Sequence, residues 1–348
     1  MKLRDVGEFG LIELIRKNTP RTRGVRLGIG DDAAWVSATH DSFLFTSDLL
    51  IEGVHFNRDW ISMPELGHKS LTASLSDIAA MGGTPAYFLM SLALPDLTTQ
   101  QVEGLYRGVH KLAKEYDAAL VGGDTCAADR MVIDVFVAGY APYGPVTRSG
   151  ATVGDDIYVT GTLGDSALGL ALLAETTDSG SARDRTHLIR RHCHPTARVK
   201  TGVQLAKGKI AKAMMDISDG LVQDLGHICE ASGTGAILWQ ELLPLSPAFS
   251  RVARPRDVSL ALAGGEDYEL LFTAATQHRK AVERIAQRTG VRITRIGESV
   301  PKRRGLTLIN QQGANIPLSE FGYDHFGTSS QPRRRPTRPK RIKTARSR

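Results

Sequence analysis

The stretch SMPELGHKSLTASLSDIAAMGG, residues 62–83, predicts a helix with an acid inside it. Ser62 can cap the N-terminus, Pro64 suits the first turn, and the closing Gly-Gly pair ends the helix, so we expect it over residues 64–81. Asp77 lies there among small and apolar residues, where aspartate is a poor helix former and costly to bury unpaired. Two interpretations are open for Asp77, a solvated helix face and a functional ligand.

Outward from this helix, strand and helix patterns alternate along the chain, which predicts an α/β (α+β) fold. Turn-forming residues gather over 145–155, and we place a domain boundary there, which gives domains 1–148 and 149–326. A polar stretch, 176–185, predicts an exposed loop. We expect strands over 43–48, 118–121, 131–141, 157–160, 268–273 and 291–296, helices over 98–116 and 168–173, and a strand–turn–helix unit over 213–233.

Composition limits the class of protein. The chain has 348 residues, of which 41% are hydrophobic, enough for about two domains with their own cores. Its three cysteines form no CxxC pair, which argues against a disulfide framework or a zinc site and indicates a reducing compartment. No apolar run approaches the ~20 residues that span a bilayer, and the N-terminus has no apolar signal region. We therefore expect a cytoplasmic protein with no membrane partner.

The net charge of +7 comes from the C-terminal end of the chain. Residues 327–348 hold nine Lys or Arg and no acid, which leaves 35 basic and 37 acidic side chains in residues 1–326. Such a Pro/Arg-rich tail cannot bury apolar surface, so we expect it to be disordered. Two roles stay open: a solvated extension, which the composition favours, and a contact with nucleic acid or another polyanion.

Acidic side chains recur in turns of small residues, several of them at predicted strand ends, where open α/β sheets bind ligands. Clustered carboxylates would not all stay ionised without cations between them, and oxygen ligands of this kind suit Mg²⁺ with substrate phosphates. Each turn alone is typical of an ordinary turn former; the set together favours a metal–phosphate site. The acids are Asp31 and Asp32 in GIGDDAA, Asp48 in FTSDLL, Asp77 in SLSDIAAMGG, Asp124 in VGGDT, Asp216 and Asp219 in MDISDG, and Glu266 and Asp267 in AGGEDYEL.

Familiar nucleotide and hydrolase motifs are missing. The sequence has no Walker-type G-x-x-x-x-G-K-[ST], no G-x-G-x-x-G after a strand, no kinase H-R-D or D-F-G set, no G-x-S-x-G and no H-E-x-x-H. Of ten histidines only His55, in EGVHF, stands beside the acidic motifs, and a structural role for it remains open. Nucleotide chemistry in this chain would use another scaffold.

Seven motifs in order resemble those of the thiamine-monophosphate kinase family, within the aminoimidazole-ribonucleotide synthetase-like superfamily of ATP-binding proteins. The resemblance spans about residues 5–326. It implies two α/β domains, a homodimer paired through the N-terminal sheets, and ATP-dependent, Mg²⁺-dependent phosphorylation of thiamine monophosphate to thiamine diphosphate, usually aided by K⁺. The motifs are GIGDDAA, TSDLLIEGVHF, KSLTASLSDIAAMGGTP, VGGDT, RSGATVGDDIYVTGTLGDSALGL, MDISDGLVQDLGHI and GGEDYELLFT.

The resemblance also implies site residues, position by position. Two positions vary within the family: Tyr323 stands where some members have Trp, and GGDT reads GGN in some members. We expect Asp32 to bind metal and Asp31 to shape its turn or lie in an outer layer of the site. The magnesium ligands implied are Asp32, Thr46, Ser47, Asp48, Asp77, Asp124, Asp216 and Asp219; the ATP contacts are Tyr106, Gly123, Asp124, Arg148 and Ser218; the thiamine phosphate contacts are His55, Glu266 and Tyr323; and the catalytic set is Asp77, Arg148 and Asp219.

Other classes of protein fit the sequence less well. A selenophosphate synthetase needs a reactive Cys or selenocysteine near its N-terminus, and this chain has no Cys before Cys126. An aminoimidazole-ribonucleotide synthetase lacks the combination of MDISDGL with GGEDYEL, and a hydrogenase-maturation relative would carry a C-terminal cysteine. A nucleic-acid-binding protein acting through the Arg-rich tail stays as the alternative from a different class.

Overall fold

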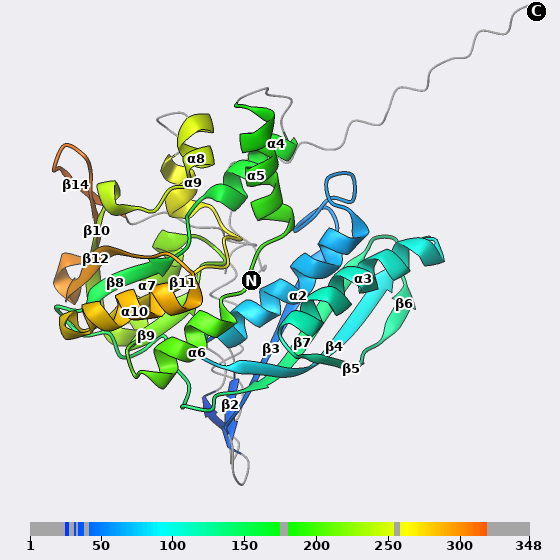
Figure 1. Ribbon diagram of the computed structural model, residues 1–348, viewed down its shortest axis with the longest axis horizontal. Helices are drawn as coiled ribbons and strands as arrows, with labels where there is room; N and C mark the ends of the chain where they lie inside the picture. The colour runs from blue at the N-terminus through cyan, green and yellow to red at the C-terminus, as the bar shows by residue number, and fades with distance from the viewer. Residues whose placement is uncertain are drawn as a thin grey trace, which may run out of the picture. The chain divides into compact units, whose positions relative to one another are not determined.

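The computed structural model describes residues 25–27, 31–32, 34–37, 42–174, 180–253 and 258–318, which form two sheets with their helices (Figure 1). None of the described helices is both long and apolar enough to cross a membrane. The strands are β1 (Val25–Leu27), β2 (Ala34–Ser37), β3 (Ser42–Ile51), β4 (Thr84–Leu94), β5 (Ala119–Gly122), β6 (Thr125–Ala127), β7 (Val132–Tyr140), β8 (Asp156–Thr160), β9 (Ala213–Asp216), β10 (Thr234–Trp239), β11 (Leu270–Ala274), β12 (Ile293–Pro301), β13 (Leu306–Ile309) and β14 (Asn315–Pro317). The helices are α2 (Met63–Ala80), α3 (Thr99–Glu115), α4 (Asp165–Ala174), α5 (Ala182–Cys193), α6 (Val199–Lys207), α7 (Leu221–Ser232), α8 (Pro247–Val252), α9 (Val258–Ala263) and α10 (Arg279–Thr289), with 3-10 turns η1 (Gln240–Leu242), η3 (Thr276–His278) and η4 (Lys302–Arg304).

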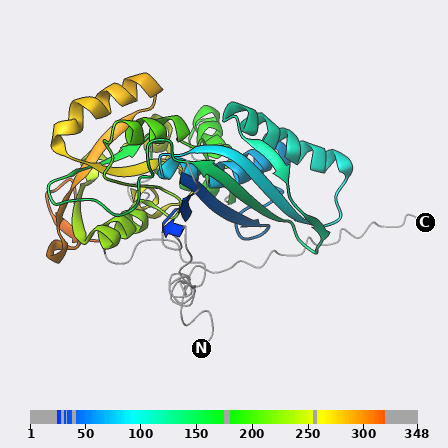
Figure 2. The ribbon, with the colours of Figure 1, turned by 90° about the horizontal axis from the view of Figure 1, so that it is seen from below.

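The first sheet has the strand order β1-β2-β3-β7-β4-β5, and β6 also pairs with β4. Its long central strands β3, β7 and β4 are antiparallel, whereas β5 and β6 run parallel to β4. Helices α2 and α3 cover one face of this sheet, and the view from below shows the strands on the side away from them (Figures 1 and 2). One face of the sheet is therefore buried by the two helices.

Helix α2 is the element predicted from residues 62–83, and the structure confirms the prediction to within a residue at each end. Ser62 caps the helix: its Oγ accepts from the backbone N of Glu65, while the Glu65 side chain accepts from the backbone N of Ser62. Pro64 lies in the first turn. The helix starts here because Ser62, Glu65 and Pro64 act within its first turn.

The second sheet has the order β14-β13-β10-β12-β8-β11-β9, antiparallel except for β10 with β13. Several expectations for this half are wrong at their edges: the helix expected over 168–173 begins at Asp165, and the strand expected over 291–296 runs from Ile293 to Pro301. The loop expected over 176–185 gives way to α5 at Ala182, because Ser181 caps a helix whose buried face includes Leu188. The strand expected from Tyr268 begins at Leu270, because Tyr268 has a left-handed φ of 52°.

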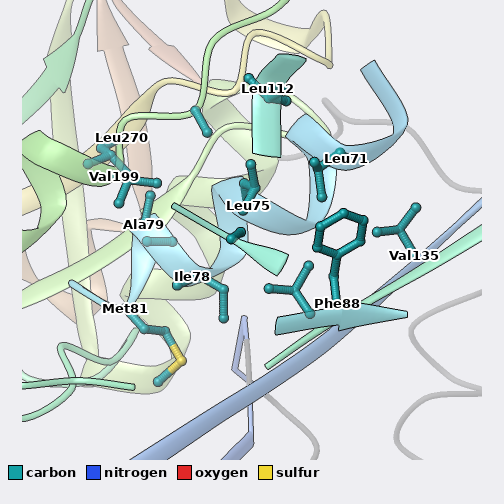
Figure 3. Close-up of a cluster of buried hydrophobic side chains, with 14 of the residues drawn as sticks. Leu71, Leu75, Ile78, Ala79, Met81, Phe88, Leu112, Val135, Val199 and Leu270 are labelled. Carbon is teal, nitrogen blue, oxygen red and sulfur yellow. The ribbon is translucent and has the colours of Figure 1, made fainter. Parts of the chain in front are cut away.

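Helix α2 packs against helices on both sides. A Cβ on Gly108 of α3 would lie 1.8 Å from Pro64 O, and one on Gly202 of α6 would lie 2.1 Å from Ala79 O, so glycine is required at both crossings. One buried apolar cluster continues through α2 from Phe88 on the first sheet to Leu270 on the second (Figure 3). The core thus fixes α2 against both halves of the chain.

Candidate functional site

Three carboxylates from distant parts of the chain meet beside the C-terminal end of α2. Asp32 lies between β1 and β2, Asp77 lies in the last turn of α2, and Asp216 ends β9. Each offers one oxygen atom, and these three atoms lie within 4.8 Å of one another. The described residues hold no other such group of metal-binding side chains.

Hydrogen bonds orient each of the three carboxylates. Thr46 Oγ1 donates to Asp77 Oδ2, Ser76 Oγ donates to Asp216 Oδ2 at 2.5 Å, and Arg148 Nη2 donates to Asp32 Oδ1 at 2.5 Å. The donors come from β3, α2 and the segment before β8. Neighbouring elements of both sheets therefore hold the cluster in place.

The cluster is strongly perturbed electrostatically. Burial raises the pKa of Asp216 to about 8, and the neighbouring Asp32 and Asp48 carboxylates add to the rise. Burial, then the charges of Asp48 and Asp216, raise the pKa of Asp77 well above its usual value. Burial likewise raises the pKa of Asp48 to about 6. These groups repel one another when ionised, and a cation among them would relieve that repulsion.

The donor set fits a divalent cation. Within the described residues, Asp32 Oδ2 and Asp48 Oδ2 are buried and have no hydrogen-bond partner. Buried carboxylate oxygens are normally satisfied, and carboxylate oxygens with a hydroxyl are the ligands that Mg²⁺ prefers. The residues present are therefore suited to hold Mg²⁺.

Asp31 and Asp32 point their carboxylates to different partners. Asp31 Oδ1 accepts from the backbone N of Asp32 and Asp31 Oδ2 accepts from the backbone N of Arg148, both at 3.0 Å. Burial, then the Asp32 charge, raise the pKa of Asp31 to about 6. Asp31 thus joins the chain before β2 to the segment of Arg148, while Asp32 contributes to the three-carboxylate cluster.

Several predicted residues lie on the first half but outside this cluster. Ser47 is exposed, and its Oγ donates to Asp134 Oδ1 at 2.6 Å. Asp124 is exposed between β5 and β6, where its Oδ1 accepts from the backbone N of Thr125 at 2.7 Å. Tyr106 is half-buried on α3 and stacks on a histidine one turn later. The structure does not bring Asp124 into the group of three acids.

Gly123 precedes Asp124 in a turn that only glycine fits. Its φ is 149°, and a Cβ there would lie 1.9 Å from Met90 O. The turn therefore lies directly against β4.

The turn MDISDG carries Asp216, Ser218 and Asp219 from β9 into α7. The carboxylate of Asp224, in the first turn of α7, accepts from the backbone N of Gly220 at 3.1 Å and of Asp219 at 3.3 Å. The Asp219 carboxylate lies near Asp224 and accepts from Gln223 Nε2 at 3.4 Å. Asp224 therefore fixes the turn from inside.

Glu266 lies in the AGGEDYEL loop before β11 and meets two side chains that the sequence did not single out. Its Oε1 lies 2.9 Å from Lys69 Nζ of α2, and its Oε2 lies 3.4 Å from His192 Nδ1 of α5. Burial alone would raise the pKa of Glu266, but Lys69, His192 and His55 hold it below its usual value. His55 Nδ1 accepts from the backbone N of Ile51 at 2.9 Å.

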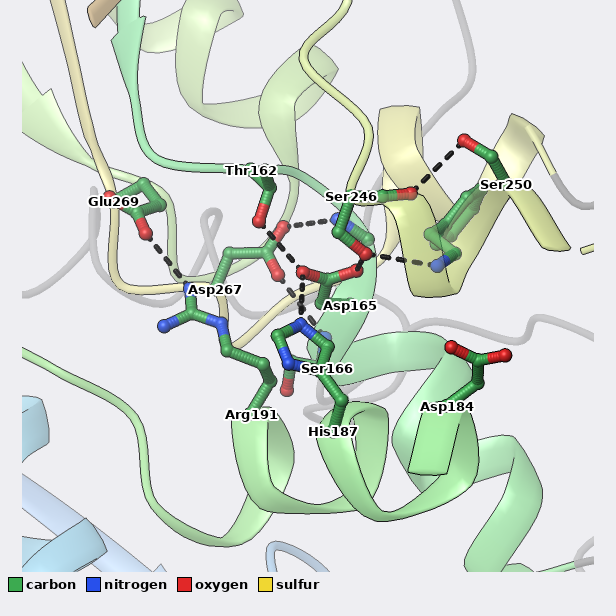
Figure 4. A network of polar contacts seen from close by, with 12 residues as sticks. Thr162, Asp165, Ser166, Asp184, His187, Arg191, Ser246, Ser250, Asp267 and Glu269 are labelled. Carbon is green, nitrogen blue, oxygen red and sulfur yellow. Dashed lines mark hydrogen bonds and ion pairs between the residues drawn. The ribbon is translucent and has the colours of Figure 1, made fainter. Parts of the chain in front are cut away.

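The remaining acids of the AGGEDYEL loop brace the second half (Figure 4). Asp267 Oδ2 accepts from the backbone N of Gly164 at 2.7 Å, and Glu269 accepts from Arg191 Nη2 at 2.8 Å. Asp165 accepts from the hydroxyls of Thr162 and Ser246. This network fixes the loop that carries Glu266.

Sequence reasoning missed Lys69, Ser76, His192 and Asp224. A signal was present for two of them: Lys69 and Ser76 are seven residues apart on α2 and so share one helix face. Ser76 contacts Asp216 from that face and Lys69 contacts Glu266. The predicted residue Tyr323 lies outside the described part of the chain.

Comparisons with known proteins identify the family of this chain. The family models "AIR synthase related protein, N-terminal domain" and "AIR synthase related protein, C-terminal domain" match residues 30–141 and 152–308. The thiamine-monophosphate kinase of Escherichia coli (strain K12) is 41% identical over 326 residues, which cover 92% of this chain and 99% of that protein. The thiamine-monophosphate kinase of Bacillus subtilis (strain 168) is 36% identical over 324 residues, with the same coverage of both chains.

A solved structure described as AaThiL complexed with AMPPCP and TMP has a similar fold. It is 36% identical to this chain and has a TM-score of 0.81, covering 93% of this chain and 99% of its own. Both halves of the chain, and the site between their sheets, fall within these matches. The chain belongs to the thiamine-monophosphate kinase family of AIR synthase related proteins.

Proposed function

We propose that this chain transfers the γ-phosphoryl group of ATP to thiamine monophosphate, giving thiamine diphosphate and ADP. The observation that carries the proposal is the meeting of Asp32, Asp77 and Asp216, with unpartnered buried oxygens on Asp32 and Asp48. Relatives over nearly the whole chain are thiamine-monophosphate kinases, and one relative of known structure is complexed with AMPPCP and TMP.

The metal-binding role is assigned to the acids and hydroxyls near the end of α2. When bound, Mg²⁺ would neutralise charge between the two phosphate groups that must approach each other. Asp124, which is exposed, and Asp219, which is half-buried, would complete the set from the turns around it. The residues proposed to hold Mg²⁺ are Asp32, Thr46, Ser47, Asp48, Asp77, Asp124, Asp216 and Asp219, with K⁺ as a further cation.

We assign the substrate contacts to residues outside the three-carboxylate cluster. Arg148, which donates a hydrogen bond to Asp32, is proposed to stabilise charge on the transferred group. Asp77, Arg148 and Asp219 form the proposed catalytic set. The proposed ATP contacts are Tyr106, Gly123, Asp124, Arg148 and Ser218, and the proposed contacts to thiamine monophosphate are His55, Glu266 and Tyr323.

The chemistry needs no strong general base. The acceptor is a phosphate oxygen that is already anionic near neutral pH, so the difficulty lies in bringing two polyanions together. Two like unit charges at ~4 Å repel by about 1 kcal/mol in water and more in a drier site. Residues that hold the two phosphates in line therefore carry the catalysis, and we propose direct transfer without a phosphoenzyme.

We further propose a homodimer that pairs through the open face of the first sheet. Leu49, Tyr87, Leu89 and Val121 are large apolar side chains exposed on strands of that sheet, and such patches mark protein interfaces. The domain limits proposed are 1–148 and 149–326, and 327–348 is proposed as a separate basic segment. A cytoplasmic location fits the same family.

One assay tests the proposed function. Coupled ADP release should follow addition of thiamine monophosphate, should be absent with free thiamine, and should depend on Mg²⁺. Equal turnover of both acceptors, or none with thiamine monophosphate, would reject the assignment. Binding of Mg²⁺ measured by calorimetry, and its loss in Asp216→Asn, tests the metal site separately from activity.

A further inference from the structure

Helix α2 buries a lysine whose ammonium group faces Glu266, the carboxylate proposed to contact the substrate. The Lys69 side chain is 0% exposed, and its Nζ lies 2.9 Å from Glu266 Oε1 and 3.3 Å from His192 Nε2. A buried ammonium is costly unless it is paired and hydrogen-bonded. These contacts, from the AGGEDYEL loop and from α5, supply that pairing.

The contact with Lys69 fixes the proton position of His192. An ammonium only donates, so His192 Nε2 accepts and the ring proton lies on Nδ1. Nδ1 lies 3.4 Å from Glu266 Oε2 and 3.1 Å from Ser166 Oγ. Burial, then the Lys69 charge, lower the pKa of His192 to about 4, so the ring is neutral near neutral pH. His192 therefore accepts from Lys69 and presents a donor on the side of Glu266.

The backbone of Glu266 is held as firmly as its side chain. Its φ is 65°, a left-handed value that is uncommon for a residue with a side chain, and its N donates to Ser218 O at 2.8 Å. The Glu266 side chain stays 26% exposed. Lys69 and His192 thus hold the Glu266 carboxylate in place. Its exposed part leaves oxygen lone pairs that can accept hydrogen bonds from a ligand.

We propose that Lys69 and His192 are positioning residues that hold Glu266 as an ionised hydrogen-bond acceptor for the cationic, amino-bearing rings of the substrate. The inference rests on the proposed function, in which Glu266 contacts thiamine monophosphate. An ionised carboxylate accepts hydrogen bonds and attracts positive charge, so it favours an N–H donor over a carbonyl in the same place. Thiamine monophosphate carries an amino group on its pyrimidine and a positive thiazolium.

Lys69→Met tests this role, because methionine keeps much of the volume and removes the charge. KM for thiamine monophosphate should rise by about tenfold or more, while KM for ATP should stay within about twofold. The acid limb of the pH profile of kcat/KM for thiamine monophosphate should move up by about one unit or more, because Glu266 loses its cation. Equal changes in both KM values with an unmoved acid limb would overturn the proposal.

Substrate preference gives a second readout that a merely structural role would not move. Oxythiamine monophosphate carries a carbonyl where thiamine monophosphate carries its amino group. The wild-type protein should prefer thiamine monophosphate, and Lys69→Met should lose most of that preference. An unchanged ratio of kcat/KM values in Lys69→Met would count against the positioning role.

A double variant still tests the proposal if Lys69→Met folds poorly. Lys69→Met leaves a carboxylate without its cation, whereas Lys69→Met with Glu266→Gln removes both charges. The double variant should recover the Tm lost by Lys69→Met and should have the same KM for thiamine monophosphate as Glu266→Gln alone. Additive effects on KM would show that Lys69 acts independently of Glu266.

Arg279→Met is the matched control. Arg279 pairs with the buried Asp156 of β8, which Arg295 also contacts, so its loss removes one of two cations from a buried carboxylate. It should lower Tm and leave KM for thiamine monophosphate unchanged; a rise like that of Lys69→Met would make the Lys69 effect a general loss of stability. Absence of wild-type turnover would overturn the proposed function, whereas normal turnover with an unchanged KM in Lys69→Met would overturn the positioning role alone.

Discussion

Ser76 Oγ donates a 2.5 Å hydrogen bond to Asp216 Oδ2 and so joins α2 to the end of β9. Both residues are buried, and they come from opposite halves of the chain. Asp77 follows Ser76 directly on α2, so this contact sets the position of Asp216 relative to Asp77. The geometry of the carboxylate cluster therefore depends on a serine that carries no charge.

Ser76→Ala should raise the half-saturating Mg²⁺ concentration by about tenfold, because the partners that orient a ligand typically change metal affinity by that factor. Ser70→Ala is the control, since Ser70 is also buried on α2 but donates to Gly67 O of the same helix. Mg²⁺ titrations of ADP release compare the two. An equal change in both variants would contradict a specific role for Ser76.

Asp77→Asn should abolish Mg²⁺-dependent turnover without unfolding the protein. Burial and the charges of Asp48 and Asp216 raise the pKa of Asp77, so an uncharged amide removes repulsion from the metal-free cluster. The free energy of unfolding without metal should stay within about 1 kcal/mol of the wild-type value. ADP release and chemical denaturation measure both effects, and retained activity at ordinary Mg²⁺ would reject the ligand role.

His55→Ala and Glu266→Ala should each raise KM for thiamine monophosphate more than KM for ATP, by about tenfold for Glu266. The reason is that both residues are proposed to contact thiamine monophosphate, and the charge of His55 acts on the Glu266 carboxylate. Glu241→Ala, at an exposed position of η1, should change neither value. Equal losses for both substrates would count against the assignment.

Acid should destabilise the fold through His68. Its ring stacks on His194 and its Nε2 donates to Pro195 O at 2.7 Å, and burial, the largest cause, lowers the pKa of His68 from 6.5 to about 4. The unfolded chain binds the proton first, so this contribution is complete above pH 6.5 and is lost as the pH falls to about 4. The loss is on the order of 3 kcal/mol.

His68→Gln tests that contribution. Urea denaturation of both proteins from pH 7 to about pH 4.5 should give a difference in unfolding free energy that shrinks as the pH falls. The many other titrating groups are common to both proteins, so the difference isolates His68. A difference that does not vary with pH would refute the role of burial at this histidine.

No phosphorylated residue should accumulate during turnover. The proposed chemistry is a direct transfer, so incubation with labelled ATP should leave the protein unlabelled, and ATP–ADP exchange should require thiamine monophosphate. Mass spectrometry and exchange kinetics check this expectation. A stable phosphorylated side chain would replace direct transfer with a two-step mechanism.

The sequence predicts the elements whose signals are local. Helix α2 is confirmed because Ser62, Pro64 and the following glycines act within a few residues of its ends. The strand β4 (Thr84–Leu94) was not predicted, because its apolar run after a proline fits a strand or a buried helix equally. Only its pairing with β7 decides between them.

The family and the enzyme class were also predictable, because the acidic turns form an ordered set, and the curated relatives confirm both. The partners of Glu266 could not be predicted from the sequence. Lys69 and His192 are 123 residues apart, and a lysine on a helix is typical of a solvated face. Only the packing of α2 against α5 and the AGGEDYEL loop turns this lysine inward, and that packing is a tertiary effect.

Helix α2 fixes the separation between two parts of the proposed site. Its residues Lys69 and Ser76 contact Glu266 and Asp216, one at the proposed ring-binding end and the other at the phosphate-binding end. Seven residues of α-helix span about 10 Å, and the crossings at Gly108 and Gly202 prevent the helix from sliding. On the proposed function, this fixed separation selects the distance between a substrate's phosphate and its charged ring, so a longer or shorter molecule would contact only one of the two ends.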